Sequence, residues 1–436
     1  MPEPAERLRA IQALADIWGA LYLFHPWIGQ RVSQRDWDQV FITALPQVEQ
    51  AGPAAVLATL QAQVVQPLAD RLPSVQGFFV GSPYGRVHEG WNEDGYPYVF
   101  GRQWKTGAGA PSSPCGPEQP PCAPGQPATT VLSRAERILG LCKVWTVLRC
   151  FAPQLAASEL DPEALLPDWL ARIEAATSLE AYYRVLADIA ARLTDRHARV
   201  VAPADSLPEE AAHEDPATGR PSRRAPRKGS WLGGLRYLRP LTDNLVYMTP
   251  FAMPDAASLK ETFALIQNTR GLVLELRGYP RTHFQHELVR CLCQRPVPSP
   301  RYEIPVIGEP DLRKRTWKVV QYQVQPDGRT VYTQPVVALI DGTTQSSAED
   351  FCMYLKIAGR VTFVGRRTAG CVGNATYVNL PGGGRFTFTG MRVTWPDGSP
   401  MWGIGILPDV PVEARRAGRD EILAHGLEVL QALRTR

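Results

Sequence analysis

Apolar residues recur at every third or fourth position in two separate parts of the chain. The first part covers residues 7–70, where Leu8, Ile11 and Trp18 begin the pattern, and the second covers residues 135–192. This spacing puts apolar side chains on one face of a helix. The sequence therefore predicts two helical segments.

The pattern changes beyond Trp231, where short apolar runs alternate with stretches of helical spacing. Strands are predicted at residues 244–248, 272–276, 336–340 and 361–364, and helices at about 256–267 and 346–357. Apolar strands that alternate with helices are typical of a sheet covered by helices. An α/β fold is expected for this part.

The two helical segments repeat one another. Residues 17–26 (IWGALYLFHP) reappear as residues 144–153 (VWTVLRCFAP), with the same spacing from tryptophan to phenylalanine to proline. Each segment later reaches a Leu-Pro pair, Leu45-Pro46 in the first and Leu166-Pro167 in the second. We interpret this as an internal duplication that builds paired helical layers around aromatic residues.

Changes of composition divide the chain into segments. Proline, glycine and serine dominate one linker, and proline with charged residues dominates another. The predicted segments are a first helical copy with short strands and loops at 1–104, a linker at 105–134, a second helical copy at 135–202, a charged linker at 203–230, and an α/β core at 231–436.

Charge and cysteine content narrow the class of protein. The 436 residues carry 47 basic and 43 acidic side chains, a near balance that gives no reason to expect nucleic acid or an anionic membrane as partner. No apolar run approaches the ~20 residues of a membrane span, and the first residues do not resemble a signal peptide, so a cytoplasmic protein is expected. The eight cysteines are expected to be reduced, although Cys115 and Cys122 leave a disulfide open.

No cofactor or metal is expected. The cysteine spacings match no zinc pattern, and His283 with His286 has no third ligand in evidence.

The most informative stretch is a strand followed by a short loop and a serine at the start of a helix, residues 340–349 (IDGTTQSSAE). Backbone N–H groups and the positive end of the helix dipole lie beside such a serine and can hold an oxyanion. Ser346 is thus a candidate nucleophile. Spacing alone favours an ordinary helix cap instead, with Ser346 or Ser347 capping and Glu349 completing a capping box.

Several motifs together resemble the tail-specific (C-terminal processing) peptidase family. They are Thr-x-Ser-x-Ala-Glu at 344–349 and the segments at 364–370, 380–383, 395–398 and 405–412. Residues 270–280 resemble the family's "glycine, strand, Asp-Leu-Arg" segment, with Glu275 for the usual Asp, and residues 193–197 resemble its "Leu-x-Asp-x-His" element. The resemblance implies a ClpP/crotonase-like core of ββα units in a superhelix for about 231–436, preceded by the duplicated helical region.

The family activates its serine in two ways, with a lysine or, in the tricorn-like branch, with a histidine. Cys371 occupies the lysine position here, whereas His197 stands in the histidine position. The chain therefore resembles the tricorn-core and retinoid-binding-protein-like branch. His197 is assigned as general base and Ser346 as nucleophile, because imidazole titrates near neutral pH.

The resemblance also implies an oxyanion hole made of the backbone N–H groups of Gly278 and Ser347. The group that orients His197 stays open. Tricorn-type relatives use a serine beside the histidine and a glutamate before "Gly-x-x-Pro-Asp", where this chain has Arg196 and Trp402. Glu349 and Asp195 are the candidates to support the histidine instead.

Relatives usually carry a PDZ domain, which captures a substrate's C-terminus, between the histidine element and the core. Only 33 residues separate His197 from Trp231 here, which is below the ~50 residues of a small domain. A chain without a PDZ domain is predicted, and with it a narrow role such as trimming one dedicated precursor peptide.

Three functions follow from these observations. The first is a serine endopeptidase that acts on a peptide or protein substrate. The second is acyl transfer, giving ligation or cyclisation, through the same acyl-enzyme. The third is a non-catalytic peptide- or lipid-binding protein, as in the retinoid-binding relatives. The substrate and the oligomeric state are not determined by the sequence.

Overall fold

The computed structural model describes residues 3–24, 34–60, 131–152, 155, 161–193, 195–203, 214–215, 220–221, 237–280, 284–306, 316–326, 328, 331–413 and 420–434. The chain forms two compact units: unit 1 is Met1–Leu207, Ile304–Lys318 and Asn374–Met391, and unit 2 is Pro208–Glu303, Val319–Gly373 and Arg392–Arg436. The predicted strand and loop segment at 78–100, most of both linkers, Cys115, Cys122 and His283 lie outside the described residues.

Unit 1 is mainly helical, as the apolar spacing predicts. Its described helices are α1 (Pro4–Phe24), α3 (Gln34–Ala51), η1 (Pro53–Ala55), α4 (Val56–Leu60), α6 (Arg134–Phe151), α7 (Pro162–Ala175) and α8 (Leu179–Arg192). Ser133 and Glu136 form a capping box at the start of α6, and Asp161 caps α7. The prolines of the two Leu-Pro pairs, Pro46 and Pro167, lie inside α3 and α7.

An ion-pair network joins the two helical copies of unit 1. Arg7 on α1 and Arg134 on α6 each bind both Glu49 on α3 and Glu174 on α7. The Nε of Arg7 lies 2.8 Å from Glu49, and an Nη of Arg134 lies 2.6 Å from it. One arginine and one glutamate thus come from α1 and α3, and another arginine and glutamate from α6 and α7.

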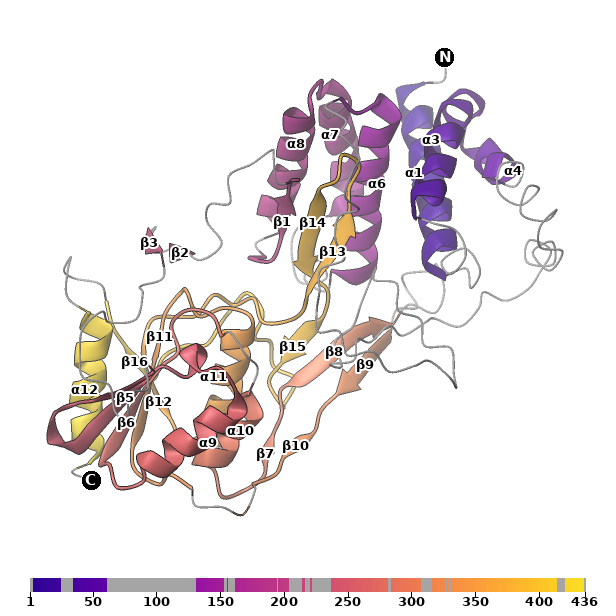
Figure 1. Ribbon diagram of the computed structural model, residues 1–436. Coiled ribbons are helices and arrows are strands. Elements are labelled where there is room, and N and C mark those ends of the chain that lie inside the picture. Colours follow the sequence, from indigo (N-terminus) through magenta and orange to yellow (C-terminus); the bar gives the residue numbers. More distant parts are fainter. Residues whose placement is uncertain are drawn as a thin grey trace. The chain divides into compact units, whose positions relative to one another are not determined.

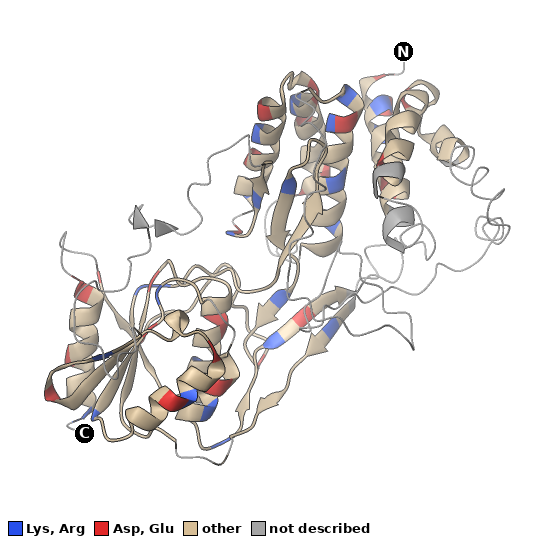
Figure 2. Cartoon of the chain, in the orientation of Figure 1, with Lys and Arg blue, Asp and Glu red and all other residues tan. Residues whose placement is uncertain are grey.

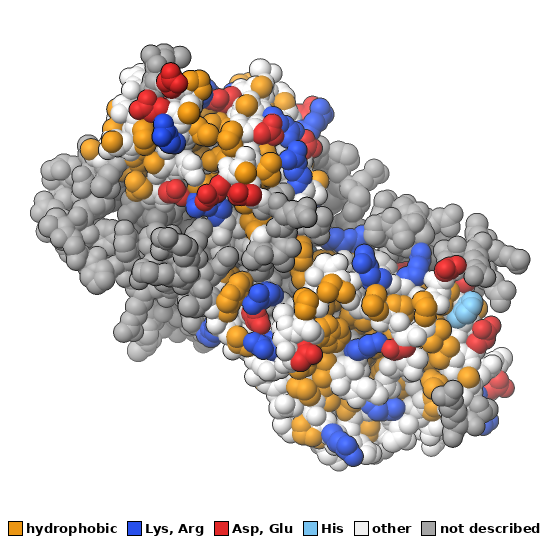
Figure 3. Space-filling view, turned by 180° about the vertical axis from the view of Figure 1, so that it is seen from behind, with side chains coloured by type: hydrophobic (Ala, Val, Ile, Leu, Met, Phe, Trp, Pro, Cys, Tyr) orange, Lys and Arg blue, Asp and Glu red, His pale blue; other side chains and the backbone are white. Residues whose placement is uncertain are grey.

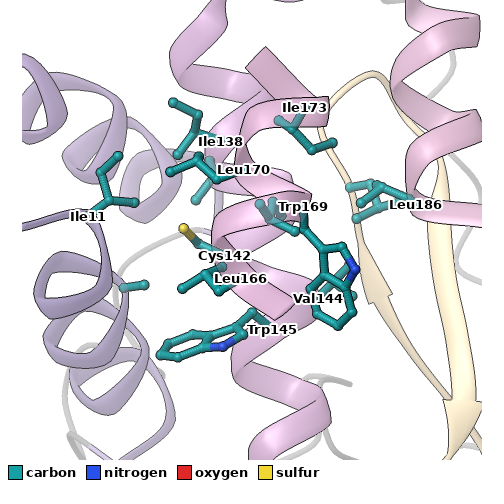
Figure 4. Packing of buried hydrophobic residues seen from close by; sticks show 14 of the residues in the cluster. Ile11, Ile138, Cys142, Val144, Trp145, Leu166, Trp169, Leu170, Ile173 and Leu186 are labelled. Carbon is teal, nitrogen blue, oxygen red and sulfur yellow. The ribbon is translucent and has the colours of Figure 1, made fainter. Parts of the chain in front are cut away.

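Aromatic side chains fill the core of unit 1. Trp18 and Trp37 stack with ring centroids 6.4 Å apart, and each indole N–H donates to the backbone oxygen of the other residue. In the second copy Trp145 and Trp169 are fully buried. Figure 4 shows Trp145 on the side of α1 and Trp169 on the side of the β13–β14 hairpin. The tryptophans that mark the repeat in the sequence are therefore core residues.

A β-hairpin from late in the sequence belongs to unit 1. Strands β13 (Ala375–Asn379) and β14 (Arg385–Thr389) form a three-stranded antiparallel sheet with β1 (Arg199–Val201). The hairpin lies beside α6 and α8 (Figure 1), and its side chains Val378, Leu380, Phe386 and Phe388 join the helical core. The compact units thus depart from the predicted boundary at residue 231, because this hairpin buries its apolar face among the helices.

Unit 2 contains a six-stranded sheet in the order β16-β12-β11-β6-β5-β4. The strands are β4 (Leu238–Pro240), β5 (Leu245–Met248), β6 (Gly271–Glu275), β11 (Val336–Ile340), β12 (Thr362–Gly365) and β16 (Val410–Pro411). All neighbouring pairs are parallel except β4 with β5. The strands predicted from apolar runs are confirmed, within one residue at each end.

Helices cover both faces of this sheet. Figure 1 shows α12 (Glu421–Leu433) on one face and α9 (Ala256–Leu265), α10 (Gln285–Leu292) and α11 (Ser347–Ala358) on the other. Every residue of β11 is buried, and Val337 and Leu339 pack in one cluster with Leu430 of α12. The chain therefore has an α/β fold with a helical N-terminal region, as predicted.

Shorter elements complete the described fold. They are β2 (Glu214–Asp215), β3 (Arg220–Pro221), η6 (Thr242–Asn244), η7 (Pro250–Ala252), β7 (Val297–Pro298), β8 (Arg301–Val306), β9 (Thr316–Val320), β10 (Gln323–Val324) and β15 (Arg392–Thr394).

Figure 2 shows charges of both signs spread over α6, α7 and α8, and Figure 3 shows hydrophobic side chains among polar and charged ones. Within the described ranges, no helix combines the length and the apolar character needed to cross a bilayer.

Candidate active site

Ser346 lies in a sharp turn between β11 and α11. The strand ends at Ile340, the helix begins at Ser347, and Ser346 has φ 53° and ψ −117°. An L-residue rarely adopts this conformation, which costs about 1–3 kcal/mol. An ordinary helix cap instead has an extended backbone. A strained strand-to-helix turn is the geometry that presents a nucleophilic serine in hydrolases of an unrelated fold.

Glu349 holds this turn in place. Its side chain is completely buried, and its Oε2 accepts hydrogen bonds from the backbone N–H groups of Ser346 at 3.1 Å and Cys371 at 2.9 Å. Its Oε1 accepts from the Thr368 hydroxyl and the Gly370 N–H, each at 2.6 Å. Burial raises the pKa of Glu349, while these donors oppose the shift. Because all of these groups donate, the side chain is used as a carboxylate.

The start of the turn is tied to its neighbours. Asp341 Oδ1 accepts from the backbone N–H and the hydroxyl of Thr343, at 2.9 and 2.6 Å. The hydroxyl of Thr344 donates to the carbonyl of Leu276 at 3.0 Å. Since Leu276 directly follows β6, this bond connects the serine turn to the end of the neighbouring parallel strand.

Gly278 lies two residues beyond that contact. β6 and β11 are parallel neighbours with Glu275 opposite Leu339, so their carboxyl ends meet at one edge of the sheet. Gly278 has φ 108°, which strains any residue with a side chain, and no atom lies within 4 Å of the position that a Cβ would take. Glycine is therefore required by the backbone conformation, and the space in front of its backbone is open.

An ion cluster fixes the backbone just before Gly278. Two oxygens of Asp420 accept from the guanidinium of Arg277, at 2.9 and 2.8 Å. The same guanidinium donates to Glu275 at 2.8 and 2.5 Å, and the Tyr247 hydroxyl donates to Glu275 at 2.6 Å. The pairing satisfies charges that are largely buried. Arg277 is thereby anchored on both sides.

His197 lies in unit 1, between α8 and β1. Its backbone N–H donates to Asp195 Oδ1 at 3.0 Å, and its Nδ1 lies 2.8 Å from the Thr389 hydroxyl. Thr389 donates to Asp195 through its hydroxyl at 2.8 Å and through its backbone N–H at 2.7 Å. Burial lowers the pKa of His197, Asp195 raises it, and Arg199 lowers it. The imidazole is therefore neutral near pH 7.

The expected site residues divide between the two units. Ser346, Ser347, Glu349 and Gly278 belong to unit 2, whereas His197 and Asp195 belong to unit 1. Ser347 opens α11, where helix N–H groups and the dipole favour negative charge. The two expected supporting carboxylates behave differently: Asp195 lies beside His197, while the hydrogen bonds of Glu349 go to the serine turn and the 368–371 loop.

Two contacts of the site were not predicted from the sequence. Thr389 is 192 residues from His197, and Thr368 is 19 residues from Glu349. Neither threonine lies in a position that local spacing singles out. Thr368 does lie in the segment 364–370 that resembles the family, so its place near the site could have been inferred from the sequence.

Cys371 and His286, the remaining candidates within the described residues, each contact neighbours of their own. Cys371 is buried beside Glu349, to which its backbone N–H donates. His286 Nε2 lies 2.8 Å from the Tyr322 hydroxyl and 3.1 Å from that of Tyr354. Among the described residues, no group of three or more His, Cys, Asp or Glu side chains is placed to hold a metal ion.

Comparison with known proteins adds a family and a fold. Residues 300–412 match the family model described as "Peptidase family S41", a range that includes Ser346 but not His197 or Gly278. No curated protein matches the sequence. A candidate peptidase of Parabacteroides merdae superposes with a TM-score of 0.55 at 18% identity, over 69% of this chain and 97% of its own.

Mature CPAF complexed with lactacystin gives a TM-score of 0.50 at 14% identity, over 69% of this chain and 98% of its own. A serine-to-alanine variant of CPAF gives 0.52 at 14% identity, over 69% and 96%. At these identities the likeness shows a shared fold.

Proposed function

We propose that the chain is a serine peptidase that acts through an acyl-enzyme on Ser346, a proposal that the match of residues 300–412 to the S41 peptidase family supports. This match supports peptidase activity, which is a hydrolase activity. The observation that carries the finer proposal is the strained backbone of Ser346, which Glu349 holds in the turn before α11. Strain that surrounding structure maintains is typical of a reacting residue.

The proposed reaction has two halves. His197 takes the proton of the Ser346 hydroxyl as the oxygen attacks the carbonyl carbon of the scissile peptide bond. The N–H groups of Gly278 and Ser347 hold the resulting oxyanion. Collapse of the intermediate breaks the C–N bond, and the imidazolium of His197 returns the proton to the leaving amine. Water, deprotonated by the same imidazole, then hydrolyses the ester.

The substrate is proposed to be one dedicated precursor peptide or protein. The 33 residues between His197 and Trp231 leave no room for a PDZ domain that would capture many C-termini. We also place the reaction in the cytoplasm, a proposal that the buried thiols Cys142, Cys293 and Cys352 support. Recovery of the protein from an oxidising compartment of its cells contradicts that location.

The test is cleavage of a panel of unrelated denatured proteins and of a peptide library, with new termini identified by mass spectrometry. We expect cleavage of few sequences, and none by Ser346→Ala at equal thermal stability. Efficient cleavage of most of the panel contradicts a dedicated substrate. Activity that survives Ser346→Ala contradicts the nucleophile. Products with a new amide bond, in place of free termini, identify acyl transfer.

Lactacystin provides a second probe, because CPAF has been solved complexed with it. We expect lactacystin to inhibit this chain by acylating Ser346 with release of its thiol, so that the peptide that contains Ser346 gains the mass of the acyl group. If neither cleavage nor any adduct is found with folded protein, the non-catalytic binding function replaces the peptidase.

A further inference from the structure

A histidine that acts as general base needs a second group to fix its tautomer and its ring orientation. The two positions that supply this group in tricorn-type relatives hold Arg196 and Trp402 here. Neither offers a carboxylate or a hydroxyl. The orienting group of His197 must therefore come from elsewhere in the chain.

We propose that Thr389 and Asp195 are the positioning residues of His197, and that together they hold its imidazole with the proton on Nδ1 and the lone pair on Nε2. This inference rests on the proposed function of His197. The arrangement is a relay in which Asp195 binds Thr389 and Thr389 binds the ring.

The hydrogen-bond donors fix the direction of the relay. Oδ1 of the Asp195 carboxylate, which can only accept, lies 2.8 Å from the Thr389 hydroxyl, so the hydroxyl proton points to Asp195. The same hydroxyl oxygen lies 2.8 Å from His197 Nδ1 and, with its only proton donated to Asp195, takes part in this contact as the acceptor. The Nδ1 therefore carries the proton and Nε2 the lone pair, which is the tautomer that the proposed reaction requires.

The relay is anchored at each end. Asp195 also accepts from the backbone N–H groups of His197, at 3.0 Å, and Thr389, at 2.7 Å, and its side chain is only 2% exposed. Thr387, two residues before Thr389 on β14 and hence on the same face of the strand, donates to the carbonyl oxygen of His197. One strand thus binds both the backbone and the ring of His197.

The β13–β14 hairpin carries both threonines to the histidine. The hairpin pairs with β1, which begins at Arg199, two residues after His197. It brings Thr387 and Thr389 to the histidine from almost two hundred residues away in the sequence. When the imidazole accepts a proton, the carboxylate of Asp195, 3.9 Å from Nδ1, stabilises the positive charge.

The first experiment measures the tautomer directly. Nitrogen-15 NMR of the ring nitrogens of the 7 histidines, with the His197 signals assigned by His197→Ala, is expected to show a protonated Nδ1 and an unprotonated Nε2 at pH 8. In Thr389→Val we expect a mixture of tautomers. A wild-type Nε2–H tautomer overturns the relay, and this result does not depend on whether the protein is a peptidase.

The second experiment measures the rate at which a fluorophosphonate labels Ser346 as a function of pH. Thr389→Val removes the hydroxyl at nearly constant volume, and we expect the rate to fall by about 10²-fold, within the range of general-base catalysis. Thr389→Ser, which keeps the hydroxyl, is expected to restore most of the rate. The matched control is Thr262→Val, a fully buried threonine of α9 whose hydroxyl donates to Ser258 O.

The third experiment measures the pH dependence of labelling in Asp195→Asn, which would not change if Asp195 only supported the fold. The charged groups that face His197 are Asp195, which raises its pKa, and Arg199, which lowers it. Removal of the Asp195 charge therefore shifts the acid limb of the labelling profile to lower pH and also lowers its plateau. If Thr389→Val labels like Thr262→Val and Asp195→Asn leaves the acid limb in place, the proposal is overturned. If no variant and no wild-type protein labels, the peptidase proposal fails instead.

Discussion

Replacement of Glu349 by glutamine tests whether this carboxylate holds the serine turn. The substitution keeps the size of the side chain but exchanges one accepting oxygen for a donating NH2 group. Glu349 accepts from the N–H of Ser346 and of Cys371 at one oxygen, and from Thr368 and Gly370 at the other. In Glu349→Gln, the amide NH2 group takes the place of one of the two oxygens. In either place it faces hydrogen-bond donors, to which it cannot bind.

The cost follows from these contacts. If the NH2 faces Thr368, that hydroxyl can turn and accept, but the N–H of Gly370 loses its acceptor, at about 1–3 kcal/mol for a buried group. The two bonds kept by the oxygen lose their charge assistance, at about 1 kcal/mol each. Relief of the buried charge of Glu349 offsets part of this sum. We expect a net destabilisation of about 2–4 kcal/mol, or a fall in Tm of about 5–15 °C.

The labelling rate should fall further than stability alone implies. Once the bond from Ser346 N–H to Glu349 is lost, the strain of about 1–3 kcal/mol at Ser346 can relax. Relaxation of this size corresponds to a decrease of about 5- to 150-fold in the rate of fluorophosphonate labelling per folded molecule. The assay combines thermal unfolding with labelling kinetics well below Tm.

The matched control is Asp350→Asn, which changes the next buried carboxyl of α11. Asp350 accepts from the Tyr302 hydroxyl at 2.8 Å and the Gln285 amide at 3.0 Å. We expect this variant to label at the wild-type rate. If Glu349→Gln labels as fast as Asp350→Asn, or if its Tm equals that of the wild type, the reasoning about the turn is refuted.

Three further changes test other parts of the structure. Burial raises the pKa of Asp350 to about 6, so the protonated side chain stabilises the fold below the unfolded pKa, and this contribution is lost as pH rises to about 6. Between pH 4 and pH 7 the free energy of unfolding of Asp350→Asn should therefore rise by about 2–3 kcal/mol relative to wild type, and a pH-independent difference in Tm contradicts this. Gly278→Ala should reduce labelling by about 10²–10³-fold, because a φ of 108° strains alanine and relief of that strain turns the backbone N–H away from the oxyanion. The fall in Tm should be small, since no atom lies within 4 Å of the added Cβ, and unchanged labelling contradicts the reasoning. Burial lowers the pKa of Lys143, whose Nζ lies 2.5 Å from Asp38 Oδ2. Lys143→Met should lower the free energy of unfolding by about 3–5 kcal/mol, and the double variant with Asp38→Leu should recover most of this loss; a double variant no more stable than the single one contradicts a buried pair.

Local patterns in the sequence predicted those features that depend on neighbouring residues. The strand at 336–340 is a run of apolar residues buried on both faces of the sheet, so its composition alone identifies it. The bond between Ser346 and Glu349 is a contact over three residues and follows from the capping-box spacing. The tryptophans of the repeat are likewise core residues because their spacing is that of a helix face.

Features that depend on distant contacts could not be predicted. The positive φ of Ser346 is not evident from the residue type, because it is maintained by a carboxylate that also binds the 368–371 loop. The β13–β14 hairpin belongs to unit 1 because its apolar face packs against helices that lie far earlier in the sequence. Thr389 therefore had no signal in the sequence, although it completes the surroundings of His197.

The most direct test of the central claim is mass spectrometry of the folded protein after treatment with a fluorophosphonate. We predict a single adduct, on the peptide that contains Ser346, that forms rapidly in the wild type and is lost or strongly slowed in His197→Ala at equal thermal stability. An adduct on another residue, or labelling of Ser346 at an unchanged rate in His197→Ala, would contradict the pairing of this serine with this histidine.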